Sequence, residues 1–94
     1  MKHYIIVKWN ELVIDKNEML KNVHKAFNDV VKIEGIYNFE VYQNVTNKDN
    51  RYDVMIKIEC SNDGLSNYDK SKLHQNWKDN YSKYILKKAI FDSE

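Results

Sequence analysis

Four strand-like stretches and two amphipathic stretches follow one another in an order that few folds accommodate. β-branched and aromatic residues predict strands at 3–9 and 85–91, and alternation of apolar with polar residues predicts strands at 37–45 and 52–60. Apolar residues at helical spacing follow the first and the third strand. No repeat, low-complexity tract or linker interrupts this order. We therefore expect a single domain over residues 1–94.

The two helical regions carry recognisable boundary signals. Asp15 and Glu18 have the spacing of a capping box, which predicts a helix start. Gly35 falls where this helix should stop, since glycine readily takes the left-handed conformation of a helix end. The second region divides near Ser71 into two segments. The first helix should bury a stripe made of Leu20, Val23, Phe27, Val30 and Val31.

Strand, helix, strand, strand, helix, strand is the pattern of an α+β, ferredoxin-like sandwich. It predicts a four-stranded antiparallel sheet with two helices on one face. The first strand is nevertheless apolar on both faces, with Ile5 and Val7 on one side and Tyr4 and Ile6 on the other. An apolar second face needs a cover. We therefore expect a homodimer joined sheet face to sheet face, which makes an α/β barrel.

Charge and composition exclude several classes of partner. The formal net charge is +1, and 14 of the 15 basic residues are Lys, so we expect no nucleic-acid partner. No apolar run approaches the ~20 residues of a membrane span, and no signal-peptide segment is evident. The single cysteine, Cys60, excludes an intramolecular disulfide. We expect a cytoplasmic protein with no membrane partner.

The sequence resembles the stress-responsive A/B barrel (Dabb) family along essentially its full length. The resemblance is carried by the opening 2–9 (KHYIIVKW), by 34–36 (EGI) with 39–41 (FEV), by 52–53 (YD), and by Tyr68 and His74 in order. It implies a ferredoxin-like protomer that dimerises through its sheet. Most members have no assigned activity, and one plant member is a cofactor-free polyketide cyclase. That cyclase implies functional roles for His3, Tyr68 and His74, and a pocket position for Phe27.

The residues themselves allow a proton-transfer site. His74 could act as a general base near neutral pH, and Tyr68 could orient it or donate a hydrogen bond to a developing enolate. Trp77 and Tyr81 follow His74 by three and seven residues, so they share its side of a helix and could form an aromatic pocket wall. His3 could line the same pocket from the first strand. The catalytic candidates are therefore His74 and Tyr68, and the pocket candidates are His3, Phe27, Trp77 and Tyr81.

Three functions remain open at this point. The first is a cofactor-independent cyclase, lyase or isomerase acting on a small carbonyl compound. The second is a non-catalytic, stress-related homodimer that binds a small apolar ligand or a protein partner, with the same side chains serving as core packing. The third is a cofactor-free monooxygenase or haem-degrading enzyme that uses Asn10, Trp77 and His74. No motif with metal-ligand spacing is present, so we expect neither a metal nor a cofactor.

Overall fold

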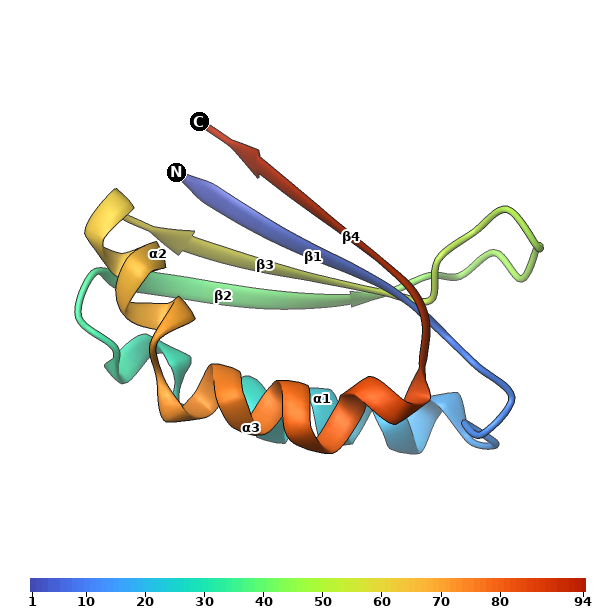
Figure 1. The fold of residues 1–94 in the computed structure, drawn as a ribbon. Coiled ribbons are helices and arrows are strands. Elements are labelled where there is room, and N and C mark those ends of the chain that lie inside the picture. Colours follow the sequence, from blue (N-terminus) through green and yellow to red (C-terminus); the bar gives the residue numbers. More distant parts are fainter.

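The computed structural model describes residues 1–94 and consists of two layers, a four-stranded sheet and a layer of helices on one of its faces (Figure 1). Every predicted strand is present, with boundaries within two residues of those expected. The strands are β1 (Lys2–Trp9), β2 (Ile36–Gln43), β3 (Val54–Cys60) and β4 (Ile85–Ser93). The helices are α1 (Lys16–Phe27), α2 (Asn62–Asp69) and α3 (Lys72–Tyr81), with short 3₁₀ helices at Val30–Lys32 and Ser82–Tyr84.

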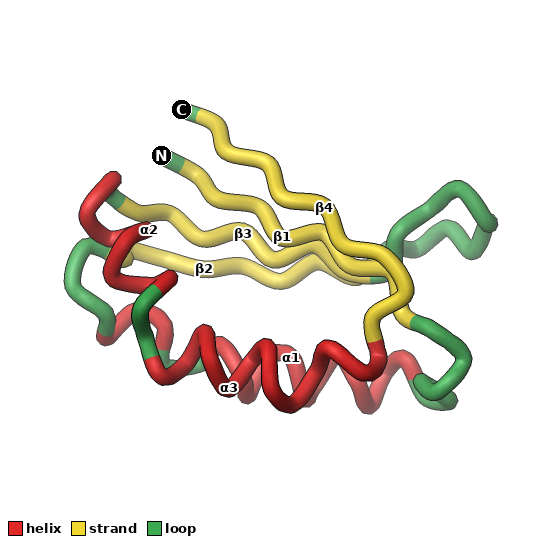
Figure 2. The backbone as a smooth tube through the Cα atoms, viewed as in Figure 1, coloured by secondary structure: helices red, strands yellow, loops and turns green.

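The strand order is β2-β3-β1-β4, and every neighbouring pair is antiparallel (Figure 2). β1 therefore lies inside the sheet, between β3 and β4, while β2 and β4 form the edges. This arrangement confirms the predicted α+β, ferredoxin-like class. It also places β4 beside β1, so residues from the two ends of the described chain face one another.

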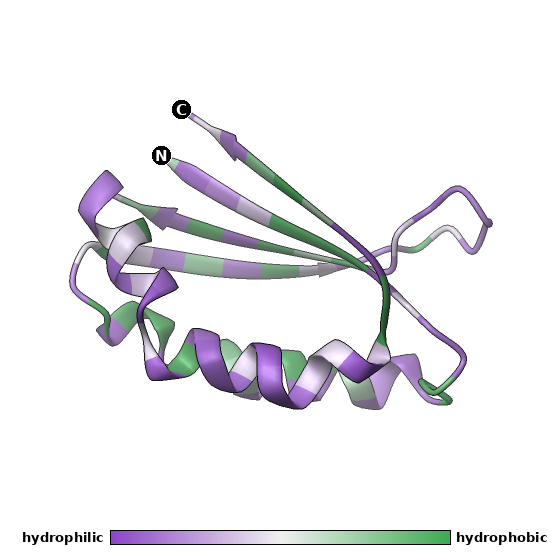
Figure 3. Cartoon of the chain, in the orientation of Figure 1, coloured by the Kyte–Doolittle hydropathy of each residue, from purple (hydrophilic) through white to green (hydrophobic).

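The core lies between the sheet and the helices. Alternate residues of β1 and β3 are buried, and hydropathy alternates along β3 in the same way (Figure 3). Burying one side of each strand in this way is what period-two patterning predicts. No helix of the structure is both long enough and apolar enough to cross a bilayer. The buried core comprises Ile5, Val7, Trp9, Met19, Val23, Phe27, Val30, Ile36, Val54, Ile56, Ile58, Cys60, Tyr68 and Trp77.

Helix α1 begins where its cap predicts and ends earlier than expected. The Asp15 carboxylate accepts hydrogen bonds from the backbone N–H groups of Asn17 and Glu18, which satisfies amides at the helix start. The helix ends at Phe27, and a separate 3₁₀ turn follows. Of the predicted stripe, Val23, Phe27 and Val30 are buried and Val31 is exposed. Met19, which the prediction left out, is buried with them.

Gly35 does not cap α1, but it needs the conformational freedom of glycine. Its φ is +87°, in the turn that leads into β2. Its backbone also lies against Gly64 of α2: a Cβ on Gly64 would stand 2.2 Å from the Gly35 carbonyl oxygen. The two glycines of the chain thus meet where the two halves of the fold pack together. At the other end of α2 the predicted break is confirmed, because Ser71 caps α3 and accepts from the His74 N–H.

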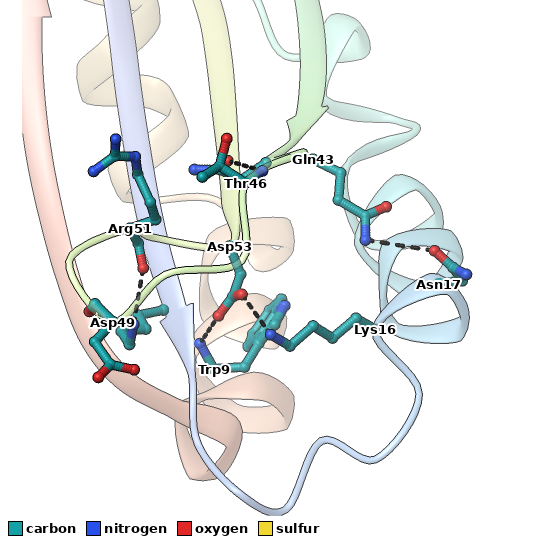
Figure 4. A network of polar contacts seen from close by, with 10 residues as sticks. Trp9, Lys16, Asn17, Gln43, Thr46, Asp49, Arg51 and Asp53 are labelled. Atoms are coloured by element: carbon teal, nitrogen blue, oxygen red, sulfur yellow. Dashed lines mark hydrogen bonds and ion pairs between the residues drawn. The ribbon is translucent and has the colours of Figure 1, made fainter.

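A polar network fixes the opposite end of the sheet (Figure 4). The Asp53 carboxylate accepts from the Trp9 backbone N–H at 2.8 Å and pairs with Lys16 at 2.9 Å. Lys8 donates to the carbonyl groups of Asp49 and Arg51, both at 2.8 Å. These contacts tie the β2–β3 connection to β1 and to the start of α1.

The face of the sheet opposite the helices has a polar half and an apolar half. On β2 and β3, Lys57 pairs with Glu40 at 2.8 Å and with Glu59 at 3.5 Å. On β1 and β4 the side chains between the Lys2–Ser93 pair at one end and the Lys8–Lys87 pair at the other are apolar, and Phe91 is 61% exposed. We call this second group the apolar band: Tyr4, Ile6, Ala89 and Phe91, which cross-strand register places side by side.

Candidate functional site

A cleft of about 330 Å³ opens between the sheet and the helices on the side of β1 and β4. It brings together four of the predicted site residues, which come from three different elements. β1 contributes His3, α2 contributes Tyr68, and α3 contributes His74 and Trp77, with β4 forming the remaining wall. The volume falls at the lower end of the range of roughly 300–1,000 Å³ common for small-molecule sites.

Tyr68 stands at the centre of this group. Its ring centroid lies 4.6 Å from that of His74 and 5.9 Å from that of His3. The residue is 1% exposed, and its hydroxyl has no hydrogen-bond partner. Burial raises the pKa of the Tyr68 hydroxyl far above its usual range. The side chain is therefore a neutral hydrogen-bond donor at physiological pH, with that donor unused.

His74 is held in a tautomer suited to accept a proton. Its Nδ1 lies 3.0 Å from the backbone carbonyl oxygen of Asp69. A carbonyl oxygen can only accept, so Nδ1 carries the proton and donates it. The neutral ring then keeps its lone pair on Nε2. The break between α2 and α3 creates this contact, because it places the carbonyl of Asp69 beside the first turn of α3.

His3 has a carboxylate partner that the sequence did not suggest. Its Nδ1 lies 2.5 Å from Oδ1 of Asp92, near the end of β4. His3 itself is buried, while Asp92 is partly exposed. Because the carboxylate accepts, the Nδ1 proton of His3 is directed toward Asp92, and Nε2 is again the free ring nitrogen.

The two remaining predicted pocket residues lie outside the cleft. Phe27 is fully buried behind it, with its ring centroid 6.4 Å from that of Tyr68 and 5.0 Å from that of Trp77. Tyr81 stacks on Trp77 at 4.9 Å, and its hydroxyl donates to the carbonyl of Asn22. Tyr81 faces a separate groove between α1 and α3. Both side chains therefore support the cleft from behind rather than line it.

Sequence reasoning missed three charged residues of the cleft: Asp69, Lys88 and Asp92. Lys88, Ile90 and Asp92 are two residues apart, so they lie on the same side of β4. This spacing in the sequence could have indicated that the three side chains share a face. What the sequence lacked was the register, which sets Asp92 opposite His3. No group of three or more His, Cys, Asp or Glu side chains is arranged to hold a metal ion.

Solved structures with a similar fold cover nearly the whole chain. A protein from Arabidopsis thaliana has a TM-score of 0.80 at 16% identity, over 99% of this chain and 92% of that one. A dimeric protein of unknown function and ferredoxin-like fold from Bacteroides fragilis has a TM-score of 0.79 at 21% identity, over 99% and 93%. A Dabb family protein with a ferredoxin-like fold from Mesorhizobium loti has a TM-score of 0.75 at 15% identity, over 99% and 93%.

The chain has the ferredoxin-like fold of these proteins. The expected likeness to the Dabb family is thereby confirmed for the fold, since a member is among the similar structures. No family model matches the sequence, and no curated protein matches it either. One fold supports many activities, so the function has to be argued from the cleft itself.

Proposed function

We propose that the protein is a homodimeric, single-domain member of the Dabb family that binds a small carbonyl compound in the cleft and moves a proton on it. His74 is the general base, and Tyr68 is the hydrogen-bond donor to the carbonyl oxygen. The reaction class is an isomerisation or an aldol-type ring closure, neither of which needs a cofactor for the proton-transfer step. The apolar band forms the dimer contact.

The observation that carries the catalytic part is the unused hydroxyl of Tyr68. A buried hydroxyl without a partner costs about 1–3 kcal/mol, so a folded protein keeps one at a cost to its stability. Here the hydroxyl is next to a histidine whose ring tautomer is set by a backbone carbonyl. A ligand carbonyl that accepted from Tyr68 would remove the cost and would gain binding energy in the same step.

The proton transfer balances without an added reactant. His74 Nε2 takes a proton from the carbon next to the ligand carbonyl, and the electron pair of that C–H bond moves to the carbonyl oxygen. Tyr68 stabilises the resulting enolate by a hydrogen bond that strengthens as negative charge develops. In a ligand with a β,γ double bond, His74 returns the proton at the γ carbon, which completes an isomerisation. In a ring closure the enolate instead attacks a second carbonyl of the same molecule, and His74 gives its proton to the resulting alkoxide.

The test is proton exchange rather than turnover of one chosen substrate. In D₂O, wild type should speed deuterium incorporation next to the carbonyl of small phenolic ketones, followed by ¹H NMR. We expect His74→Gln to reduce the enzymatic rate by about 10²–10⁴-fold, the usual contribution of a general base. His24→Gln is the matched control, because His24 is exposed on α1 and lies away from the cleft. Equal exchange rates in wild type and His74→Gln would contradict the catalytic assignment.

One feature of the cleft favours a second function, a ligand-binding homodimer without catalysis. The Tyr68 hydroxyl has essentially no exposed surface, so a ligand reaches it only after neighbouring side chains shift. Binding without turnover would satisfy the hydroxyl equally well. One experiment distinguishes the two functions. If a ketone changes the NMR signals of Tyr68 and His74 but no bound ketone exchanges deuterium, the result supports binding alone.

A further inference from the structure

The β4 wall of the cleft carries an unpaired positive charge. Lys88 lines the cleft on the same side of the strand as Ile90 and Asp92, in register with Val7 of β1. It is exposed, and it takes part in none of the ion pairs of the structure. Its chain neighbour Lys87 pairs in register with Lys8 and so belongs to the other face of the sheet.

The two carboxylates of the cleft lie on other parts of its wall. Asp92 follows Lys88 by four residues, which is about 13 Å along an extended strand, and it is already engaged by His3. Asp69 is the last residue of α2, and it lies across the cleft from β4. An anionic group on a ligand would be repelled near either carboxylate and attracted near Lys88.

We propose that Lys88 selects ligands that carry a carboxylate, so that the cleft takes a small carbonyl acid rather than a neutral ketone. This rests on the proposed function and adds the substrate class to it. The carboxylate pairs with Lys88, the apolar middle of the ligand lies along Ile90 and Trp77, and the carbonyl reaches Tyr68. Lys88 thus orients the ligand and is a specificity residue, not a catalytic one.

The charge pattern explains why only one orientation is favourable. With the carboxylate at Lys88, the neutral carbonyl end comes to the part of the cleft that holds both histidines and Tyr68. Reversing the ligand would place its carboxylate beside Asp92, at like charge, and would leave the Tyr68 hydroxyl to a hydrocarbon chain. Orientation by one remote charge is a common way to position the reacting atoms of a substrate.

The experiment compares a carboxylate probe with its uncharged methyl ester. 3-Benzoylpropionate and its methyl ester are titrated into the ¹⁵N-labelled full chain, and binding is followed by NMR shifts of cleft residues. At low salt we expect wild type to bind the acid about three- to fivefold more tightly than the ester, as for a solvent-accessible ion pair. The preference should shrink as salt is raised, because exposed charges are screened.

Variants at Lys88 assign the preference to this side chain. Lys88→Met keeps the length of the chain and removes the charge, so the acid and the ester should bind equally. Lys88→Arg should restore the preference for the acid, and Lys88→Glu should reverse it. Lys78→Met is the control, since it removes one exposed charge from α3 outside the cleft and should leave the preference unchanged.

The outcomes distinguish this inference from the proposed function. If the ester shifts the signals of Tyr68 and His74 and the acid binds no more tightly, Lys88 does not select the ligand while the cleft still binds carbonyl compounds. An acid preference that survives in Lys88→Met also overturns the inference. If neither probe shifts any cleft residue at millimolar concentration, both the ligand class and the proposed use of this cleft are overturned.

Discussion

At the scale of single residues, Tyr68 ties stability to function. Its ring packs among His3, Phe27 and His74, where it adds to the core, while its hydroxyl remains unsatisfied. The ring and the hydroxyl therefore contribute with opposite sign to the folding free energy. A side chain selected only for packing would be served better by phenylalanine at the same place.

This contrast makes Tyr68→Phe informative. Removing an unpaired buried hydroxyl while keeping the ring should stabilise the protein by about 1 kcal/mol. For a domain of this size the melting temperature should rise by about 4–8 °C, measured by thermal denaturation followed by circular dichroism. The same variant should lose ketone binding. A fall in melting temperature would mean that the hydroxyl is paired in solution, for example with a bound water.

At the scale of elements, local signals predicted the starts of helices better than their ends. The Asp15 cap and the Ser71 cap act through their own side chains within three residues, so the sequence shows them directly. The end of α1 depends instead on packing, because Val30 is buried from a separate 3₁₀ turn and Gly35 forms the turn after it. The spacing of apolar residues alone predicted that the helix runs on through Val30 as far as Gly35.

The β2–β3 pair makes stability depend on pH. The hydrogen bonds from Lys57 and then Tyr42 lower the pKa of the Glu40 carboxyl below the ordinary value of a glutamate. A carboxyl with a lowered folded-state pKa stabilises the fold above its unfolded pKa, and this contribution is lost as pH falls through the folded value.

We therefore expect the stability advantage of wild type over Glu40→Gln to be full at pH 6 and to shrink as the pH is lowered below the ordinary pKa of a glutamate carboxyl. Urea denaturation of both proteins at several pH values measures this difference. Glu11→Gln is the control, since Glu11 is exposed in a loop and makes no ion pair. A constant difference between wild type and Glu40→Gln across this range would show that the cross-strand contacts do not act on the folded state.

At the scale of the whole molecule, patterning predicted the architecture and only part of the cleft. Strand and helix order alone selects the ferredoxin-like class, since each element buries one face in a limited number of ways. The cleft depends on register between strands that are far apart in sequence, such as His3 opposite Asp92. No local pattern contains that register, which is why Asp92 and Lys88 emerged only from the structure and why Phe27 and Tyr81 fell behind the cleft.

The apolar band predicts the assembly state. Ile6→Lys places a charge at the centre of the band and should convert a dimer of about 23 kDa, twice the 11.3 kDa of one chain, into a monomer. Analytical ultracentrifugation distinguishes the two masses. Val45→Lys is the control, because Val45 is 99% exposed on the β2–β3 connection. This substitution adds the same charge outside the apolar band. A monomeric wild type, or a dimeric Ile6→Lys, would reject the proposed contact.

The interior position of β1 has a consequence for the nascent chain. β1 leaves the ribosome before its neighbours β3 and β4, and its earliest partner, Val54 opposite Val7, follows 47 residues later. At roughly 5–20 residues per second, this strand waits about two to nine seconds for a neighbour. During that time both of its hydrogen-bonding edges and both of its apolar faces are open. The yield of folded protein in a cell should therefore depend on translation speed and chaperone supply as well as on final stability.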